Sequence, residues 1–329
     1  MVRLKYQMTP NGRRALTAAA AAIAAALLFV AWSRTQGDNG GFAAVTAPVA
    51  SMMSSSLQGQ ATAAATPRDA AHCGESWTES GGFFCESPAA WALRKNIYAL
   101  QAKQQTIPAS DKSDDVGTWW QSNYEPNFSC AFEQRLGNAG DGGKWVCDPT
   151  SISSALAGRE CVIYSVGSGR RVGFEKALHQ ELPDCKVFTF DHTVGDAGAQ
   201  VVPSYVTFLP YGMAAEDQPG TPLRGLGSIR KELGHEPSNR RVSLEILKVD
   251  IEGAEYEALL PWLRNGDMDG VRQLLIEIHG PYRSGKYDKA RELFDALEEA
   301  GWVITHKEPN LIKAGTLVEY AFLKLDWKL

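Results

Sequence analysis

The chain has 329 residues, 44% of them hydrophobic and 22% charged, and 33 basic against 38 acidic side chains give a net charge of -5. This composition is typical of a globular protein, with room for one catalytic-sized unit and appended segments. Because nucleic-acid binding needs a basic surface, the acidic balance argues against a nucleic-acid partner, although it does not exclude a local basic patch.

The N-terminal segment has the pattern of a membrane anchor. Four basic residues precede an apolar run over residues 15–32: Arg3, Lys5, Arg13 and Arg14. About 18 residues at 1.5 Å each give roughly 27 Å of helix, enough to cross a thin bilayer. The pattern predicts a single-pass type II protein, with residues 1–14 cytosolic and the body in the lumen of the endoplasmic reticulum or Golgi. A cleaved signal peptide and an organelle transit peptide are the alternatives.

The next two regions differ in composition. Residues 33–72 are rich in Ala, Ser, Gly and Thr and are predicted to form a flexible stem. Residues 73–150 bring back aromatic side chains among glycines and prolines, which indicates a loop-rich lead-in with one helix over 88–105.

Cysteine usage also points to the secretory pathway. The six cysteines form an even set without a Cys-x-x-Cys pair, which favours disulfides over zinc: Cys73, Cys85, Cys130, Cys147, Cys161 and Cys185. Asn127 begins an Asn-Phe-Ser glycosylation triplet, in agreement with a lumenal body.

Residues 151–329 alternate short apolar runs with amphipathic stretches, the pattern of an α/β domain with a parallel sheet. We expect strands at 161–165, 186–190, 206–210, 246–250 and 273–278, and helices at 173–180, 253–263 and 284–300. Two further strands at 302–307 and 317–325 have no helix between them, so they are predicted to form an antiparallel hairpin at the sheet edge.

Two features indicate a nucleoside-containing cofactor. The first strand runs into Gly167-Ser168-Gly169 and then a helix, and such a turn lets a ligand approach the backbone and free N–H groups. Asp191 ends the second strand 22 residues after Gly169, near the spacing at which a carboxylate accepts ribose hydroxyls. The alternatives are a purely geometric turn and an Asp that caps the next helix.

A third segment carries a family resemblance. Residues 247–259, Leu-Lys-Val-Asp-Ile-Glu-Gly-Ala-Glu-Tyr-Glu-Ala-Leu, resemble the fourth-strand motif of FkbM-type S-adenosylmethionine methyltransferases, and residues 161–324 are similar to the methyltransferase-like protein 24 family. The resemblance implies a class I, Rossmann-like sheet of seven strands with the last antiparallel. It also implies that S-adenosylmethionine and a methyl acceptor meet above the carboxyl ends of the strands.

The resemblance assigns the cofactor-binding residues. Gly167 and Gly169 would face the methionine portion, Asp191 the ribose, and Gly212 with Met213 the adenine. Many such enzymes carry an acid before the glycines, where this chain has Tyr-Ser-Val at 164–166. Glu175, at the start of the next helix, would replace that acid or simply favour the helix dipole.

The same resemblance places Asp250 and Glu252 at the transferred methyl group or the acceptor. His279 follows the next strand, and a histidine that titrates near neutrality suits a general base. A divalent cation on Asp250, Glu252 and Glu277 is an alternative. We predict no metal, because Glu277 is expected to point away.

Two smaller expectations concern neighbouring side chains. Glu255 and Glu257 are expected to lie on a helix and face solvent. In the implied strand order Cys161 and Cys185 would lie side by side and form a disulfide.

The sequence therefore predicts a methyltransferase that acts on an oxygen of a small molecule, glycan or protein. A catalytically inert binding module with the same fold is the alternative. A nicotinamide-dependent reductase is disfavoured because no Tyr-x-x-x-Lys pair follows the fourth strand.

Overall fold

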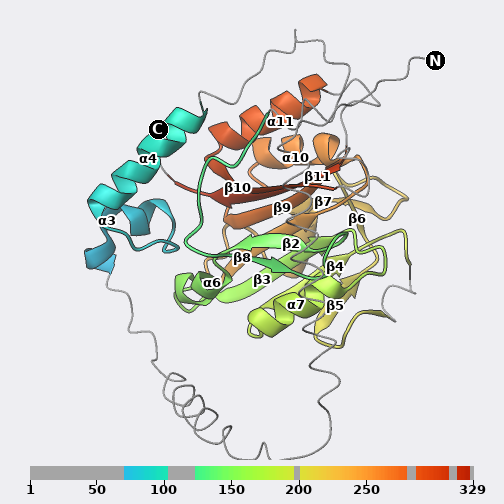
Figure 1. The fold of residues 1–329 in the computed structure, drawn as a ribbon. Helices are drawn as coiled ribbons and strands as arrows, with labels where there is room; N and C mark the ends of the chain where they lie inside the picture. The colour runs from blue at the N-terminus through green and yellow to red at the C-terminus, as the bar shows by residue number, and fades with distance from the viewer. Residues whose placement is uncertain (1–69, 103–122, 196–200, 280–286, 311–316, 327–329) are drawn as a thin grey trace, which may run out of the picture. The chain divides into compact units, whose positions relative to one another are not determined.

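A mixed sheet of seven strands forms the centre of the computed structural model (Figure 1). The structure describes residues 70–102, 123–195, 201–279, 287–310 and 317–326. The strand order is β10-β11-β9-β8-β3-β4-β5. The strands are β3 (Glu160–Val166), β4 (Lys186–Phe190), β5 (Val206–Leu209), β8 (Val242–Val249), β9 (Val271–His279), β10 (Trp302–Pro309) and β11 (Leu317–Lys324).

The strand directions confirm the predicted topology. β9, β8, β3, β4 and β5 pair in parallel, whereas β11 pairs antiparallel with both β9 and β10. The C-terminal hairpin is therefore present, with β11 inserted inside the sheet and β10 at its edge. In β8 every residue after the first is buried, as expected for a parallel strand covered on both faces.

Three helices cover one face of the sheet: α9 (Leu226–Leu233), α10 (Glu255–Arg264) and α11 (Tyr287–Glu299). Trp262 and Leu259 of α10 and Leu293 of α11 are completely buried against strand residues such as Leu247. In Figure 1 α10 and α11 lie on the opposite side of the sheet from α6 and α7.

The other face is covered partly by the lead-in. Here α6 (Pro149–Ala155) and α7 (Gly173–Glu181) share a core with α4 (Pro88–Ala102) and β2 (Lys144–Cys147). The rings of Phe84, Trp91 and Phe128 pack together in this core. The lead-in also contains α3 (Ala70–Glu79) and β1 (Glu133–Leu136), which pairs antiparallel with β2. The lead-in is therefore structurally part of the sheet's second covering layer.

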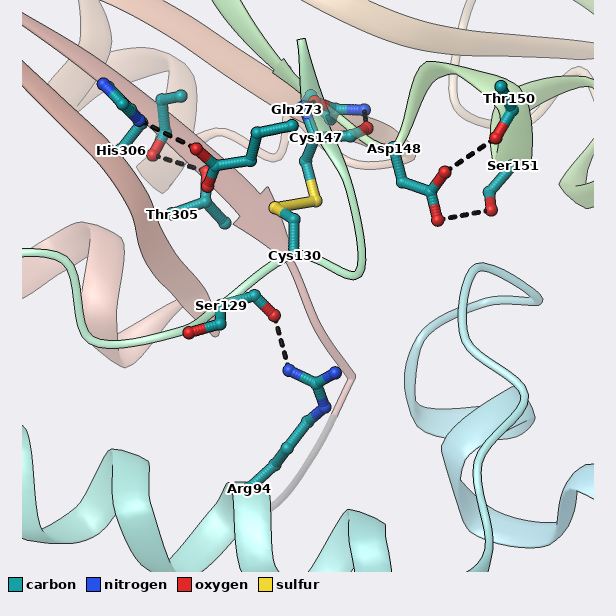
Figure 2. The surroundings of a disulfide bond; sticks show 12 residues. Arg94, Ser129, Cys130, Cys147, Asp148, Thr150, Ser151, Gln273, Thr305 and His306 are labelled. Atoms are coloured by element: carbon teal, nitrogen blue, oxygen red, sulfur yellow. Dashed lines mark hydrogen bonds and ion pairs between the residues drawn. A yellow bond between two sulfur atoms is a disulfide. The ribbon is translucent and has the colours of Figure 1, made fainter.

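Three disulfides join cysteines that are near neighbours in sequence: Cys73–Cys85, Cys130–Cys147 and Cys161–Cys185. The last confirms the expected bridge between the starts of β3 and β4. Figure 2 shows the second, beside which Arg94 of α4 donates a hydrogen bond to the backbone oxygen of Ser129. The hydrogen bond joins α4 to residue 129, and the disulfide joins the next residue to β2, so the two contacts connect separate segments of the lead-in.

The glycosylation triplet does not have the accessibility that its sequence suggests. Asn127 is only 9% exposed. Its side-chain oxygen accepts a hydrogen bond from the Ile304 backbone N–H over 2.8 Å. Because a glycan needs an exposed amide, this burial argues against a glycan on Asn127 of the folded chain, and the triplet gives no support to a lumenal body.

Several predicted segments lie outside the described residues, among them the cytosolic N-terminus (1–14), the anchor (15–32) and most of the stem (33–72). α3 begins at Ala70, so the last residues of the expected stem are helical instead. Within the described ranges, none of the helices combines the length and apolar character needed to traverse a bilayer. α4 agrees with the predicted helix as far as Ala102, beyond which its continuation is not described.

Candidate active site

A cavity of about 720 Å³ opens at the carboxyl ends of β3, β4, β8 and β9. All nine residues selected from the sequence line it: Gly167, Gly169, Glu175, Asp191, Gly212, Met213, Asp250, Glu252 and His279. Segments more than 100 residues apart thus converge on one site, at the sheet edge where ligands of parallel α/β folds bind.

The glycine turn after β3 is shaped by a close backbone approach. Gly167 has φ of 80°, and a Cβ atom at this position would lie 1.8 Å from the backbone oxygen of Asp250. Its N–H donates to the backbone oxygen of Phe190 at the end of β4. The turn is therefore fitted between the ends of two neighbouring strands, where no side chain can be accommodated.

Glu175 supplies an acid where the first strand has none. Glu175 is 1% exposed and accepts a 2.6 Å hydrogen bond from the Ser165 hydroxyl, which lies in the stretch 164–166 before the glycines. The second carboxylate oxygen, Oε2, has no hydrogen-bond partner among the described residues. A buried carboxylate with an unused acceptor atom lines the cavity and is suited to a cationic group such as an amino group.

Asp191 organises the glycine turn. One of its oxygens accepts hydrogen bonds from the backbone N–H groups of Ser168 and Gly169 and from the Ser168 hydroxyl, and the other accepts two from Thr193. Burial alone would raise the pKa of Asp191, but these hydrogen bonds outweigh it and hold the pKa below its usual value. The carboxylate is ionised and already has five donors, so ribose hydroxyls would have to displace some of them.

Gly212 and Met213 lie on β6 (Gly212–Ala214), which pairs with β7 (Leu223–Gly225) in a small parallel sheet that the sequence analysis missed. A Cβ at Gly212 would lie 2.3 Å from Nδ1 of His192, so the chain passes close to that ring. Met213 is buried at the cavity wall. Segments of three residues are too short for a periodic pattern to reveal.

Asp250 follows β8 and faces two ammonium groups. Its Oδ2 lies 3.7 Å from Nζ of Lys144 and 3.5 Å from Nζ of Lys248. Lys248 also donates to the backbone oxygens of Val166 and Gly167. Burial alone would raise the pKa of Asp250, but the positive charges of Lys248, Lys144 and His279 outweigh burial and hold the pKa below its usual value. The group is therefore a carboxylate.

His279 is held between two carboxylates. Its Nδ1 lies 2.9 Å from Glu255 Oε1 and its Nε2 lies 3.4 Å from Glu252 Oε2. Burial lowers the pKa of His279, but the hydrogen bond to Glu255 and the nearby negative charges raise it to about 9. This pKa favours the protonated imidazole at neutral pH, and the role of His279 as a general base stays a prediction.

Glu255 and Glu257 differ in their surroundings. Glu255 is completely buried. In addition to its contact with His279, its side chain accepts hydrogen bonds from the backbone N–H groups of Ile251 and Gly253. The expectation that it faces solvent is wrong, whereas Glu257 is exposed and pairs with Lys289. Glu252 adopts φ of 58°, an unusual backbone for a residue other than glycine, and its carboxylate projects toward solvent beside His279.

Glu277 corrects another expectation, because it lines the cavity instead of pointing away. Its side chain accepts a hydrogen bond from Asn310 at 3.3 Å and lies beside Asp250 and Glu319. Burial, together with those two negative charges, raises the pKa of Glu277 to about 7. A charged residue near the carboxyl end of a buried strand is the signal that could have pointed to Lys248, which the sequence analysis missed.

One group of potential metal ligands occurs among the described residues: Asp250, Glu252 and His279, whose ligand atoms all lie within 4.8 Å of one another. Two lysine ammonium groups already lie within 3.7 Å of Asp250, and His279 carries a proton. Because these positive charges oppose a further cation, we assign no metal to the group.

Comparison with known proteins gives the same picture as the geometry. A family model described as a methyltransferase domain matches residues 75–324. Two curated proteins, both named probable methyltransferase-like protein 24, from Homo sapiens and Rattus norvegicus, are 27% and 28% identical over 142 residues. These alignments cover 40% of this chain and 36% of each relative, so the chain spans about a third of the length of the curated relatives it matches.

The solved structures that the comparison found similar include two fibrillarins. The Methanococcus jannaschii pre-rRNA processing protein shares 10% identity at a TM-score of 0.37, covering 60% of this chain and 84% of its own. Aeropyrum pernix fibrillarin, solved with natively bound S-adenosyl-L-methionine, shares 12% identity at a TM-score of 0.34, covering 51% of this chain and 68% of its own.

Proposed function

The chain belongs to the methyltransferase-domain family, and we propose that it transfers a methyl group from S-adenosylmethionine to an oxygen atom of an acceptor held in the cavity. The observation that carries this proposal is the convergence of the glycine turn, Glu175, Asp191 and Asp250 on a single cavity at the ends of parallel strands.

The residues present fit the cofactor. Glu175 has a buried, unused oxygen suited to the amino group of the methionine portion, and Gly167 leaves the backbone open beside it. Asp191 is ionised and accepts the backbone N–H groups of Ser168 and Gly169, so its carboxylate lies at the glycine turn beside which the ribose would bind. When bound, S-adenosylmethionine supplies a methyl group on a positively charged sulfur, which keeps the electron pair of the broken carbon–sulfur bond.

The residues of the chain would bind and orient the methyl acceptor. Methyl transfer requires alignment of the acceptor oxygen more than covalent assistance, so positioning dominates. Asp250 presents a carboxylate at the end of β8, and Glu252 with protonated His279 forms the adjacent rim of the cavity. These polar groups suit a hydroxyl-bearing small molecule, glycan or protein side chain.

We place the reaction in the lumen of the secretory pathway, with residues 15–32 as the anchor in a Golgi or endoplasmic reticulum membrane. Support comes from the three disulfides, since such bonds persist in oxidising compartments and are rare in the cytosol.

One observation favours the alternative of an inert binding module. The carboxylate of Asp191 already accepts five hydrogen bonds from the protein, which leaves little capacity for ribose hydroxyls. Cofactor binding separates the two functions.

The test is calorimetric titration of the full-length, disulfide-bonded chain with S-adenosylhomocysteine. We expect binding, weakened by about 10- to 100-fold in Asp191→Ala and in Glu175→Gln, because each variant removes a charged hydrogen-bond partner. Asp295→Asn, a carboxylate outside the cavity, serves as the control and should bind normally. Absence of binding by the folded chain would favour the inert module.

A further inference from the structure

A cluster of charged side chains extends from the cavity wall into the protein. It contains three carboxylates and two ammonium groups: Asp250, Glu277, Glu319, Lys144 and Lys248. If one carboxyl group is protonated, two negative and two positive charges balance. The cluster can therefore take up one proton, and the group that takes it up decides what chemistry the cluster can do.

Two carboxyl groups of the cluster face the cavity. Asp250 and Glu277 both line it, and each carboxyl group shifts the pKa of the other. Lys144 and Glu319 are not part of the cavity wall. Glu319 is the cross-strand neighbour of Glu277, on β11, and forms an ion pair with Lys144.

Lys144 comes from outside the seven-stranded sheet. It lies on β2 of the lead-in, and its side chain is only 2% exposed. Burial would lower the pKa of Lys144, but Glu319 and Asp250 raise it above the usual value, so the ammonium group stays charged. A buried ammonium group has few conformations available, and its charge acts at a fixed place.

Two contacts fix β2 over the sheet. The Gln273 side chain accepts a hydrogen bond from the Cys147 N–H over 2.9 Å and donates one to the Cys147 oxygen over 2.8 Å, as Figure 2 shows beside the Cys130–Cys147 disulfide. Gln273 and Glu277 are four residues apart on β9 and so lie on the same face. The strand that carries Glu277 therefore also holds the segment that delivers Lys144.

We propose that the Asp250–Glu277 pair accepts the proton of the acceptor hydroxyl, and that Lys144 is a positioning residue that keeps this pair ready to accept it. The proposal rests on the proposed methyl transfer. The acceptor oxygen forms a bond to the methyl carbon, the carbon–sulfur bond breaks with its electrons left on sulfur, and the hydroxyl proton moves to the pair. It is then shared between the two carboxyl groups until it returns to solvent.

The surroundings of Glu277 support this role. Burial, Glu319 of β11 and Asp250 of β8 raise its pKa, whereas Lys144 of β2 and the neighbouring His279 of β9 lower it, which leaves the pKa at about 7. Both protonation states are thus accessible near neutrality, as proton transfer requires. His279 already carries its proton at this pH.

The experiment is a pH titration of the full-length chain labelled with ¹³C at glutamate side-chain carboxyls, followed by NMR. We expect one glutamate to titrate near pH 7, and its signal to be absent from Glu277→Gln. Removing the charge of Lys144 in Lys144→Met should move this titration upward by about 1 pH unit or more, whereas Lys144→Arg should restore it.

A matched control and a second variant keep the result interpretable. Lys307 has a side chain that is only 4% exposed, and it pairs with Glu125 away from the cavity, so Lys307→Met should not move the titration. If Lys144→Met does not fold, Glu319→Gln removes a negative charge instead and should move the titration downward. The proposal is overturned if Glu277 does not titrate near pH 7, or if neither charge change shifts it. S-Adenosylhomocysteine binding, measured on the same samples, reports separately on the proposed function.

Discussion

At the scale of single residues, Gly167 is a position in the cavity wall where the close approach of another backbone segment leaves no room for a side chain. A Cβ atom there would lie 1.8 Å from the Asp250 oxygen, and its φ of 80° is unfavourable for other residues. We expect Gly167→Ala to lose S-adenosylhomocysteine binding and to be destabilised by more than about 2 kcal/mol, from backbone strain plus the clash. Calorimetry and urea denaturation measure both effects.

Gly169 is the natural control for this substitution. It also has positive φ, 52°, but a Cβ would meet nothing within 4 Å. Gly169→Ala should therefore cost only about 1–2 kcal/mol for the left-handed backbone. If both substitutions lowered the free energy of unfolding equally, the close approach of Gly167 to Asp250 would not be the cause of the loss.

His279 makes the stability of the chain depend on pH. Its pKa rises from an ordinary 6.5 to about 9 in the folded state, because Glu255 and other carboxylates favour the charged form despite burial. Its stabilisation is complete below pH 6.5 and is lost as pH rises through 9, by about 3 kcal/mol in total. Urea denaturation at pH 6.5 and pH 9 should show this fall in wild type and a smaller one in His279→Gln. An unchanged slope in the variant would contradict the assignment.

The sequence allowed the residues in the cavity to be predicted, but not the residues behind it. Gly167, Asp191 and Asp250 each follow an apolar strand directly, so their spacing places them at one edge of the sheet. Lys144 and Glu319 are 175 residues apart, and no local pattern links them. The raised pKa of His279 could not be predicted from the sequence either. It depends on Glu255, whose side chain turns inward from the start of α10.

At the scale of elements, β2 has only four residues and depends on its contacts with the sheet. Gln273 satisfies both the N–H and the oxygen of Cys147 in a buried environment. Gln273→Leu leaves both groups unsatisfied, at a cost of about 1–3 kcal/mol each. We expect a lower free energy of unfolding, measured in urea. Gln134→Leu, which removes an exposed hydrogen bond to Glu181, should be nearly neutral.

Elements were predictable where their apolar runs were long. β3, β4, β8 and β9 were all placed within a few residues of their predicted bounds, because buried parallel strands are almost continuously apolar. β1, β2, β6 and β7 have three or four residues each and carry no comparable signal. The lead-in was therefore interpreted as loop-rich, although its aromatic residues mark it as part of a core.

At the scale of the whole molecule, three disulfides contribute to the stability of the fold. They close three separate loops, with sequence separations of 12, 17 and 24 residues, so their effects should add. At about 2–4 kcal/mol each they contribute roughly 6–12 kcal/mol, which is comparable with the entire stability of a typical domain.

The chain should therefore refold from urea only under oxidising conditions. We expect recovery of near-ultraviolet circular dichroism and of S-adenosylhomocysteine binding in a glutathione redox buffer, and neither in excess dithiothreitol. A chain alkylated after reduction is the control, because it cannot reform the bonds even in the oxidising buffer. If the reduced chain refolded with an unchanged urea midpoint, the disulfides would not matter for stability, and the support they give to a lumenal site of action would be lost. A glycosylation assay cannot replace this measurement as a test of lumenal location. Asn127 is the single Asn-x-Ser/Thr site in the sequence, and it is buried against β10.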